Sequence, residues 1–249
     1  KLSGVWIMAY TTIDDPSAFF QTALWTGNST GPRTITNDGN SDLKPDLWWL
    51  KDRNVGFGHY WADSTRGVTK YLQSDTTAGE STSTGIVSAF TTDGFTLVWT
   101  GSQIPNFNGH TYVAWQWKAN GGTTASNTDG DLTSTVQVNS TAGFSIITYT
   151  GIDPIEPLDI GHGLGVVPEF WIIKSREIAG KNWGVYHKDM SASPQNGYMT
   201  LNTTNAYAAA SSWWRNEAPT STVIKTGEQD DVNRANSDYV CYAWTSIQG

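Results

Sequence analysis

One nine-residue phrase is written twice in this chain, as PDLWWLKDR at Pro45–Arg53 and as PEFWIIKSR at Pro168–Arg176. Each copy starts with proline and an acid, continues with four bulky apolar residues and a lysine, and ends in arginine. A strand that is apolar on both faces has to be covered on each side, so each phrase predicts a central strand of a buried sheet. We expect the two strands, 47–51 and 170–174, to occupy equivalent positions in two copies of one module.

The repeat extends well beyond this phrase, with its parts in the same order. TYVAWQW at Thr111 matches DYVCYAW at Asp238, and the spacing drifts only from 123 residues (45 to 168) to 127 residues (111 to 238). Small loop insertions account for such a drift. The sequence therefore predicts two tandem modules, at 19–119 and 143–249. A linker rich in Gly, Ser, Thr and Asn is expected at 120–142, and an N-terminal tail or upstream connector at 1–18.

Within each copy the patterns are those of short strands, and long helical periodicity is absent. Turn signals such as Asp93-Gly94 precede alternating stretches. We therefore expect an all-β chain in which each module is a β-sandwich of the jelly-roll, concanavalin-like kind. The last strand of each module has a heavy face and a light face, and we expect the heavy face to be buried; its members are Trp115, Trp117, Tyr242 and Trp244.

Composition restricts the possible partners. Only 15% of the residues are charged, the net charge is −8, and the 15 Lys and Arg form no basic run. Binding to nucleic acid phosphates requires cationic groups, so we expect no nucleic-acid partner. No apolar run approaches the ~18 residues of a membrane span, so we expect no membrane partner. The single cysteine, Cys241, is expected to be a buried thiol, and the chain to be a segment of a longer protein.

One polar cluster is a candidate ligand site. His59, Asp63 and Arg66 fall within HYWADSTR in the first copy. Such a cluster is able to bind a sugar acid or to act in acid–base catalysis. The alternative, which we favour, is a buried Asp–Arg pair that organises a loop. The second copy has KDMSAS at this place, so a site built on Arg66 is not shared by the two modules.

Aromatic residues outside the clear strands are the other candidates for ligand binding. Trp and Tyr rings stack on the faces of sugars, and the candidates of this kind are Trp61, Trp183, Trp213 and Trp214. The alternative for the Trp213-Trp214 pair is that one ring is core and the other lies at a module or subunit contact. We expect the same kind of contact for the N-terminal VWIMAY, residues 5–10.

No motif in the sequence predicts an enzyme, a metal or a cofactor. The glutamates are dispersed, whereas glycoside hydrolysis needs two carboxylates held ~5 to 10 Å apart. The histidines lack metal-ligand spacing. NTDGDL at Asn127 is a fragment of a calcium loop without its bidentate glutamate, so a solvated turn is the favoured interpretation.

Taken together, these phrases resemble a known family. ADSTRGVTKYL, TTDGFTL, GHGLGVVPEFWIIKSR and APTSTV resemble the tandem lectin/glucanase-like β-sandwich modules of tail-fibre-like and other structural proteins of marine tailed bacteriophages. The resemblance covers most of residues 19–249. It implies a non-enzymatic virion protein, located on the extracellular particle as a fibre or capsid-decoration segment that attaches to host surface glycans.

The resemblance also implies the partners, which are further copies of the chain in a homo-oligomer, most commonly a trimer, and other virion proteins. Two alternatives stay open. One is a secreted or cell-surface carbohydrate-binding protein, and the other is a glycan depolymerase that uses the region of His59 and Asp63.

Overall fold

The computed structural model describes residues 13–101, 104–152 and 156–247. Within them the regular secondary structure is almost entirely antiparallel strands, apart from two single-turn 3-10 helices and the four-residue helix α1 (Ser211–Trp214). The prediction of an all-β chain is therefore confirmed. Across the described ranges no helix is long and apolar enough to cross a membrane. The expected contact segment at residues 5–10 lies outside the described residues.

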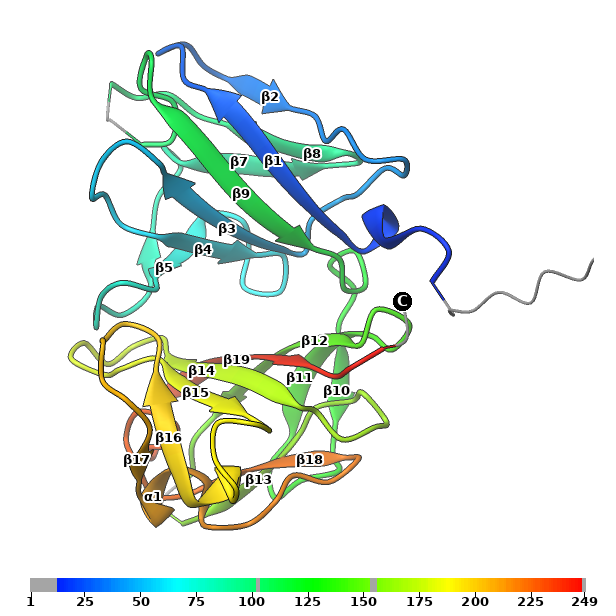
Figure 1. Ribbon diagram of the computed structural model, residues 1–249, viewed down its shortest axis with the longest axis vertical. Coiled ribbons are helices and arrows are strands. Elements are labelled where there is room, and N and C mark those ends of the chain that lie inside the picture. Colours follow the sequence, from blue (N-terminus) through cyan, green and yellow to red (C-terminus); the bar gives the residue numbers. More distant parts are fainter. Residues whose placement is uncertain (1–12, 102–103, 153–155, 248–249) are drawn as a thin grey trace, which may run out of the picture.

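The first half of the chain holds two sheets (Figure 1). The larger sheet has the order β1-β9-β3-β4-β5-β6, and the smaller has the order β2-β8-β7. The strands are β1 (Phe20–Thr26), β2 (Arg33–Ile35), β3 (Leu47–Asp52), β4 (Tyr60–Asp63), β5 (Lys70–Gln73), β6 (Ser81–Thr82), β7 (Val87–Thr91), β8 (Gly94–Leu97) and β9 (Thr111–Trp117). Their apolar inner faces form one core between the two sheets.

The second half repeats this plan with additions at the edges. Its large sheet has the order β10-β11-β12-β19-β14-β15-β16-β17, and β13 pairs with β18. The strands are β10 (Ala125–Asn127), β11 (Ser134–Asn139), β12 (Phe144–Thr150), β13 (Leu158–Gly161), β14 (Phe170–Ser175), β15 (Gly184–His187), β16 (Gly197–Thr200), β17 (Ala208–Ala209), β18 (Val223–Thr226) and β19 (Asp238–Trp244).

The two large sheets share one strand order, since β12-β19-β14-β15-β16 matches β1-β9-β3-β4-β5. Strands β3 and β14, which carry the repeated phrase, lie in corresponding interior places and are covered on both faces, as the sequence predicted. The halves differ where the first has β7, because the second has α1 before β18 and fills its core with the rings of Trp213 and Trp214.

The segment expected to be a linker, 120–142, is not one. It supplies all of β10 and β11, and β11 pairs with β12 in the large sheet. Gln137 in β11 also bonds to the first half, because its Nε2 donates to Ser64 Oγ at 3.0 Å and to Thr65 Oγ1 at 2.6 Å. The composition misled because a strand of Thr, Ser, Gln and Val needs few large apolar residues when only one face is covered.

The light and heavy faces of β9 and β19 have roles that the sequence did not predict. The light face packs into each half's own core, as with Tyr112 and Ala114 or Cys241 and Ala243. The heavy face points at the other half, so the two large sheets lie face to face in the middle of the molecule (Figure 1). Tyr242 is buried as expected, whereas Trp115, Trp117 and Trp244 are only half-buried.

A buried ion network joins the halves. Arg66 Nε lies 2.5 Å from Asp63 Oδ2, and Nη1 lies 2.8 Å from Glu80 Oε2. Nη2 donates at 3.0 Å to the hydroxyl of Tyr242, which in turn donates to Asp63 Oδ2 at 2.7 Å. Glu80 also accepts from Arg176 Nε at 3.0 Å, so a residue directly after β14 and one in β19 of the second half complete a network that begins in the first.

The charges of this network depend on one another. Burial by itself lowers the pKa of Arg66, but Asp63, Tyr242 and Glu80 outweigh that effect and raise the pKa, so the guanidinium stays charged. Burial raises the pKa of Glu80, and the two arginines bring it below its usual value. Main-chain bonds run beside the network, from Glu80 N to Arg176 O at 2.5 Å and from Gly180 N to Thr77 O at 2.9 Å.

We predict that Arg66→Met destabilises the whole chain by about 3 to 5 kcal/mol, because it leaves the buried carboxylate of Asp63 without its cation and leaves Glu80 with Arg176 and Lys70 alone. Urea unfolding followed by tryptophan fluorescence and by far-UV circular dichroism measures this loss. The two probes should give one coincident transition, because each half is stabilised by its contact with the other and we expect the two halves to unfold together. Lys70→Met is the matched control, because Lys70 faces the same Glu80 at 3.6 Å from a 41% exposed position. That change should cost about 1 kcal/mol or less. A loss of similar size in both variants would contradict the prediction.

Lys174 gives a second prediction. Its side chain is fully buried, Nζ donates to Lys181 O at 2.8 Å, and burial lowers its pKa to about 8 despite attraction from Asp231. The folded state therefore carries the full cost of the buried charge below pH 8 and is relieved of it as the pH rises toward the unfolded pKa of 10.5. Relative to Lys174→Met, the wild type should gain on the order of 3 kcal/mol in unfolding free energy across that window. A constant difference from pH 7 to 10.5 would contradict this.

Candidate functional site

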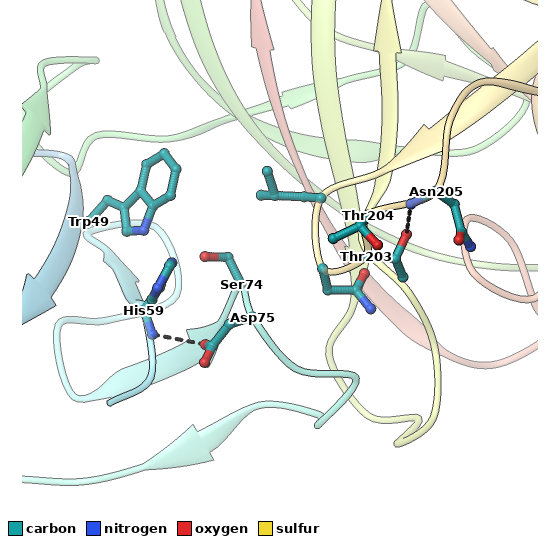
Figure 2. Close-up of a pocket in the computed structure, with 9 residues that line it drawn as sticks. Trp49, His59, Ser74, Asp75, Thr203, Thr204 and Asn205 are labelled. Carbon is teal, nitrogen blue, oxygen red and sulfur yellow. Dashed lines mark hydrogen bonds between the residues drawn. The ribbon is translucent and has the colours of Figure 1, made fainter. Parts of the chain in front are cut away.

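A groove of about 760 Å³ opens between the two halves (Figure 2). One wall comes from the first half, and the other is the loop that follows β16 in the second. The lining residues are Trp49, His59, Ser74, Asp75, Leu201, Asn202, Thr203, Thr204 and Asn205. The groove thus combines one large ring with amide, hydroxyl and carboxylate groups at its mouth.

Strand ends position the polar groups of the first wall. His59 directly precedes β4 and Asp75 lies two residues after the end of β5, so the antiparallel pairing of these strands brings the two residues together. Asp75 Oδ1 accepts the main-chain N–H of His59 at 2.8 Å. Burial lowers the pKa of the His59 imidazole, with Asp75 and Lys51 acting in opposite directions, so the ring is neutral at pH 7.

The second wall is held in place by Asn202. Its Oδ1 accepts the main-chain N–H of Trp183 at 2.9 Å, and its Nδ2 donates to Asn182 Oδ1 at 2.9 Å. Thr203 Oγ1 accepts the main-chain N–H of Asn205 at 3.3 Å. These bonds fix the loop, whose residues 203–205 remain exposed.

An aromatic trough of about 370 Å³ continues the groove inward and shares Trp49 and Leu201 with it. The other residues that line the trough are Trp61, Trp117, Phe170, Ile172 and Trp244. The rings of Trp49 and Trp61 are 4.7 Å apart, and those of Trp117 and Trp244 are 6.0 Å apart. The trough is therefore a row of ring faces contributed by both large sheets.

The residues that the sequence suggested around His59 lie in two different places in the structure. His59 lies at the mouth of the groove and Trp61 lines the trough. The side chains of Asp63 and Arg66 are 0% exposed, so the assignment of these two residues to ligand binding is wrong. They belong to the network between the halves, which is the favoured alternative of a buried structural pair.

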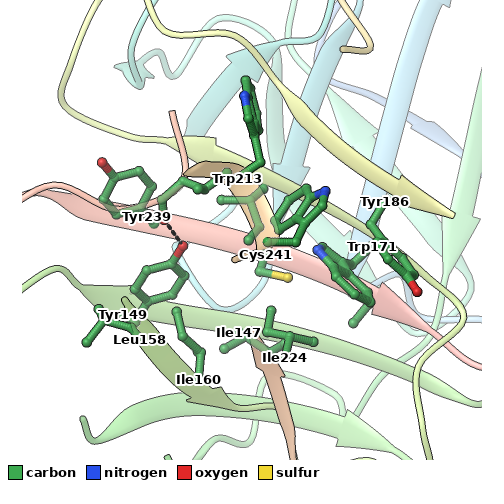
Figure 3. Close-up of a cluster of buried hydrophobic side chains, with 14 of the residues drawn as sticks. Ile147, Tyr149, Leu158, Ile160, Trp171, Tyr186, Trp213, Ile224, Tyr239 and Cys241 are labelled. Carbon is green, nitrogen blue, oxygen red and sulfur yellow. Dashed lines mark hydrogen bonds between the residues drawn. The ribbon is translucent and has the colours of Figure 1, made fainter. Parts of the chain in front are cut away.

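The remaining tryptophan candidates are core residues. Trp183 is fully buried between the halves and donates its Nε1–H to Gln73 O at 3.0 Å. Trp213 and Trp214 are both buried in the core of the second half, where Trp213 lies among the apolar side chains around Tyr239 and Cys241 (Figure 3). The expectations of sugar stacking and of a subunit contact at Trp213 and Trp214 are therefore wrong, because α1 turns both rings inward.

Sequence reasoning missed most of the groove. Trp49 was assigned to a buried strand, and Ser74, Asp75 and the loop at 201–205 were not singled out. One signal was present, since Trp49 is replaced by Ile172 at the same place in the second copy of the phrase. Because the two strands are otherwise similar, this difference indicates a position at which the fold does not require one particular residue.

The groove and trough bring together few titratable side chains. Asp75 is the one carboxylate among the lining residues of the groove and trough, whereas glycoside hydrolysis uses two across the scissile bond. Among the described residues, no group of three or more His, Cys, Asp or Glu side chains is placed to hold a metal ion. Ring faces beside hydroxyl and amide groups are suited to a ligand that is itself part apolar and part hydroxylated.

Comparison with known proteins gives one match. A family model described as "Domain of unknown function (DUF7483)" matches residues 15–249, which include both halves and the groove between them. No curated protein and no solved structure matches the chain.

Proposed function

The chain belongs to this family of unknown function, and we propose that it is a non-enzymatic structural protein of a virion that attaches to surface glycans through the groove. The observation that carries the proposal is the lining of the groove, in which Trp49 and the trough rings lie beside Asp75 and the Asn202–Asn205 loop. Sugars present apolar C–H faces and hydroxyl edges, and both kinds of surface find a counterpart here.

The place in a particle is proposed from the sequence resemblance to structural proteins of marine tailed bacteriophages. Each half is proposed to be a jelly-roll sandwich, with support from its two-sheet arrangement and the shared strand order. Both the virion protein that we propose and the alternative, a secreted carbohydrate-binding protein, would bind sugars through the same groove. Mass spectrometry of intact particles distinguishes them, because only the first places the chain in the virion.

Assembly is proposed as a homo-oligomer, with a trimer as the expected state. The groove of a single chain gives a sugar a small contact, and linked copies raise the effective concentration of the remaining sites once one has bound. Closed symmetric oligomers are the common solution for such multiplicity. A sedimentation experiment that finds only monomer for the whole protein at micromolar concentration would overturn this part.

We predict that Trp49→Ala weakens binding to a surface polysaccharide about thirtyfold, because truncating a central tryptophan costs about 2 kcal/mol or more. Titration calorimetry against a panel of purified bacterial surface polysaccharides measures the Kd. Trp99→Ala is the matched control, since Trp99 is half-buried outside the groove and packs on Phe107 at 6.2 Å.

Two outcomes would contradict the proposal. Equal weakening by Trp49→Ala and Trp99→Ala would mean that binding does not use the groove. New reducing ends after incubation of the wild type with a bound polysaccharide would favour the depolymerase alternative.

A further inference from the structure

One hydroxyl in the groove lacks a partner. Ser74 is 2% exposed, and its Oγ has no hydrogen-bond partner among the described residues. Figure 2 shows this hydroxyl turned toward the side of the groove where Trp49 and His59 lie. Most buried polar groups in proteins are hydrogen-bonded, so an orphaned hydroxyl that borders a groove points to a ligand there.

The neighbouring carboxylate, Asp75, is held in place by a hydrogen bond to one of its two oxygens. Asp75 is exposed, and its Oδ1 accepts the N–H of His59 at 2.8 Å. Among the described residues no partner bonds to Oδ2. Hydrogen bonds from a hydroxyl to an ionised acceptor are about twice as strong as neutral ones, so this oxygen is the strongest acceptor that the groove offers.

The groove offers no free cation. Its lining contains no Lys or Arg. Lys51 lies close enough to lower the pKa of His59. Its Nζ donates to the main-chain carbonyls of Asp52, Val55 and Phe57 at 2.5, 2.7 and 3.2 Å. All three of its protons are thus used within the protein. An anionic sugar that entered would lose water beside Asp75 without gaining an ion-pair partner.

From these contacts we infer that the groove selects uncharged sugars, with Ser74 and Asp75 as the residues that read their hydroxyls. This inference rests on the proposed function and adds the class of glycan. The orphaned Oγ of Ser74 is able to accept from one hydroxyl and donate to another, while Asp75 Oδ2 accepts and repels carboxylate or sulfate groups. The ring of Trp49 supplies the stacking face beside them.

The test compares two panels with the intact protein, one of neutral glucose, galactose and mannose oligosaccharides and one of matched uronic-acid and sulfated oligosaccharides. We expect binding to members of the neutral panel and at least about tenfold weaker binding to the acidic panel. Asp75→Asn, which keeps the shape and an acceptor for His59 N–H, should weaken neutral binding about ten- to hundredfold and narrow the gap between the panels. Asp189→Asn, the same change at an exposed position outside the groove, should alter neither.

Ser74→Ala distinguishes a binding role from a structural one, because it should change sugar binding without lowering stability. Removing an unsatisfied buried hydroxyl should leave the unfolding midpoint unchanged or higher, while neutral-sugar binding falls about three- to tenfold. Thr91→Val is the control, because Thr91 Oγ1 is also buried and unpartnered but lies on β7 outside the groove. It should match the stability effect and leave binding unchanged.

The outcomes separate this inference from the proposal on which it rests. A wild type that prefers acidic sugars, or variants at Ser74 and Asp75 that bind as the wild type does, would overturn the inference and leave the glycan-binding groove standing. A wild type that binds no member of either panel, nor any surface polysaccharide, would overturn both.

Discussion

The guanidinium of Arg66 is the point on which the arrangement of this molecule depends. A buried charge is tolerated only when counter-charges and hydrogen bonds surround it. Its counter-charges, Asp63 and Glu80, come from the first half of the chain, while Tyr242 and Arg176 come from the second. The network is complete only when the two large sheets face each other. The relative placement of the halves is therefore specified by electrostatics as well as by the apolar area between them.

The groove follows from that placement. Tyr242 bonds to Arg66 on one side and packs on Trp61 at 5.1 Å on the other, and Trp61 packs on Trp49 at 4.7 Å. A continuous series of contacts thus leads from the buried ions to the ring at the mouth of the groove. The trough lies where the two sheets face each other, and rings from both sheets line it.

The sequence predicted the strands more fully than their assembly. The repeated phrase identified β3 and β14 because a strand covered on both faces needs apolar residues at every position. Alternation in β9 showed which residues share a face, but a period of two carries no information about what covers that face. The sequence therefore predicted only that the heavy faces are buried, and the structure shows that they lie between the halves. Strand β11 was assigned to a linker for a related reason, since its inner residues are few and its outer ones polar.

The groove was less predictable than the fold because neither copy of the repeat contains it. Trp49 and Asp75 come from the first half, and Asn202 with its loop comes from the second. The second copy lacks the tryptophan and the arginine. The shared strand order therefore accounts for the scaffold, whereas the network and the groove depend on residues that the two copies do not share. One consequence of the proposed function is that folding and binding are coupled. A change that parts the halves removes the groove without touching any residue that lines it, and the family model spans both halves.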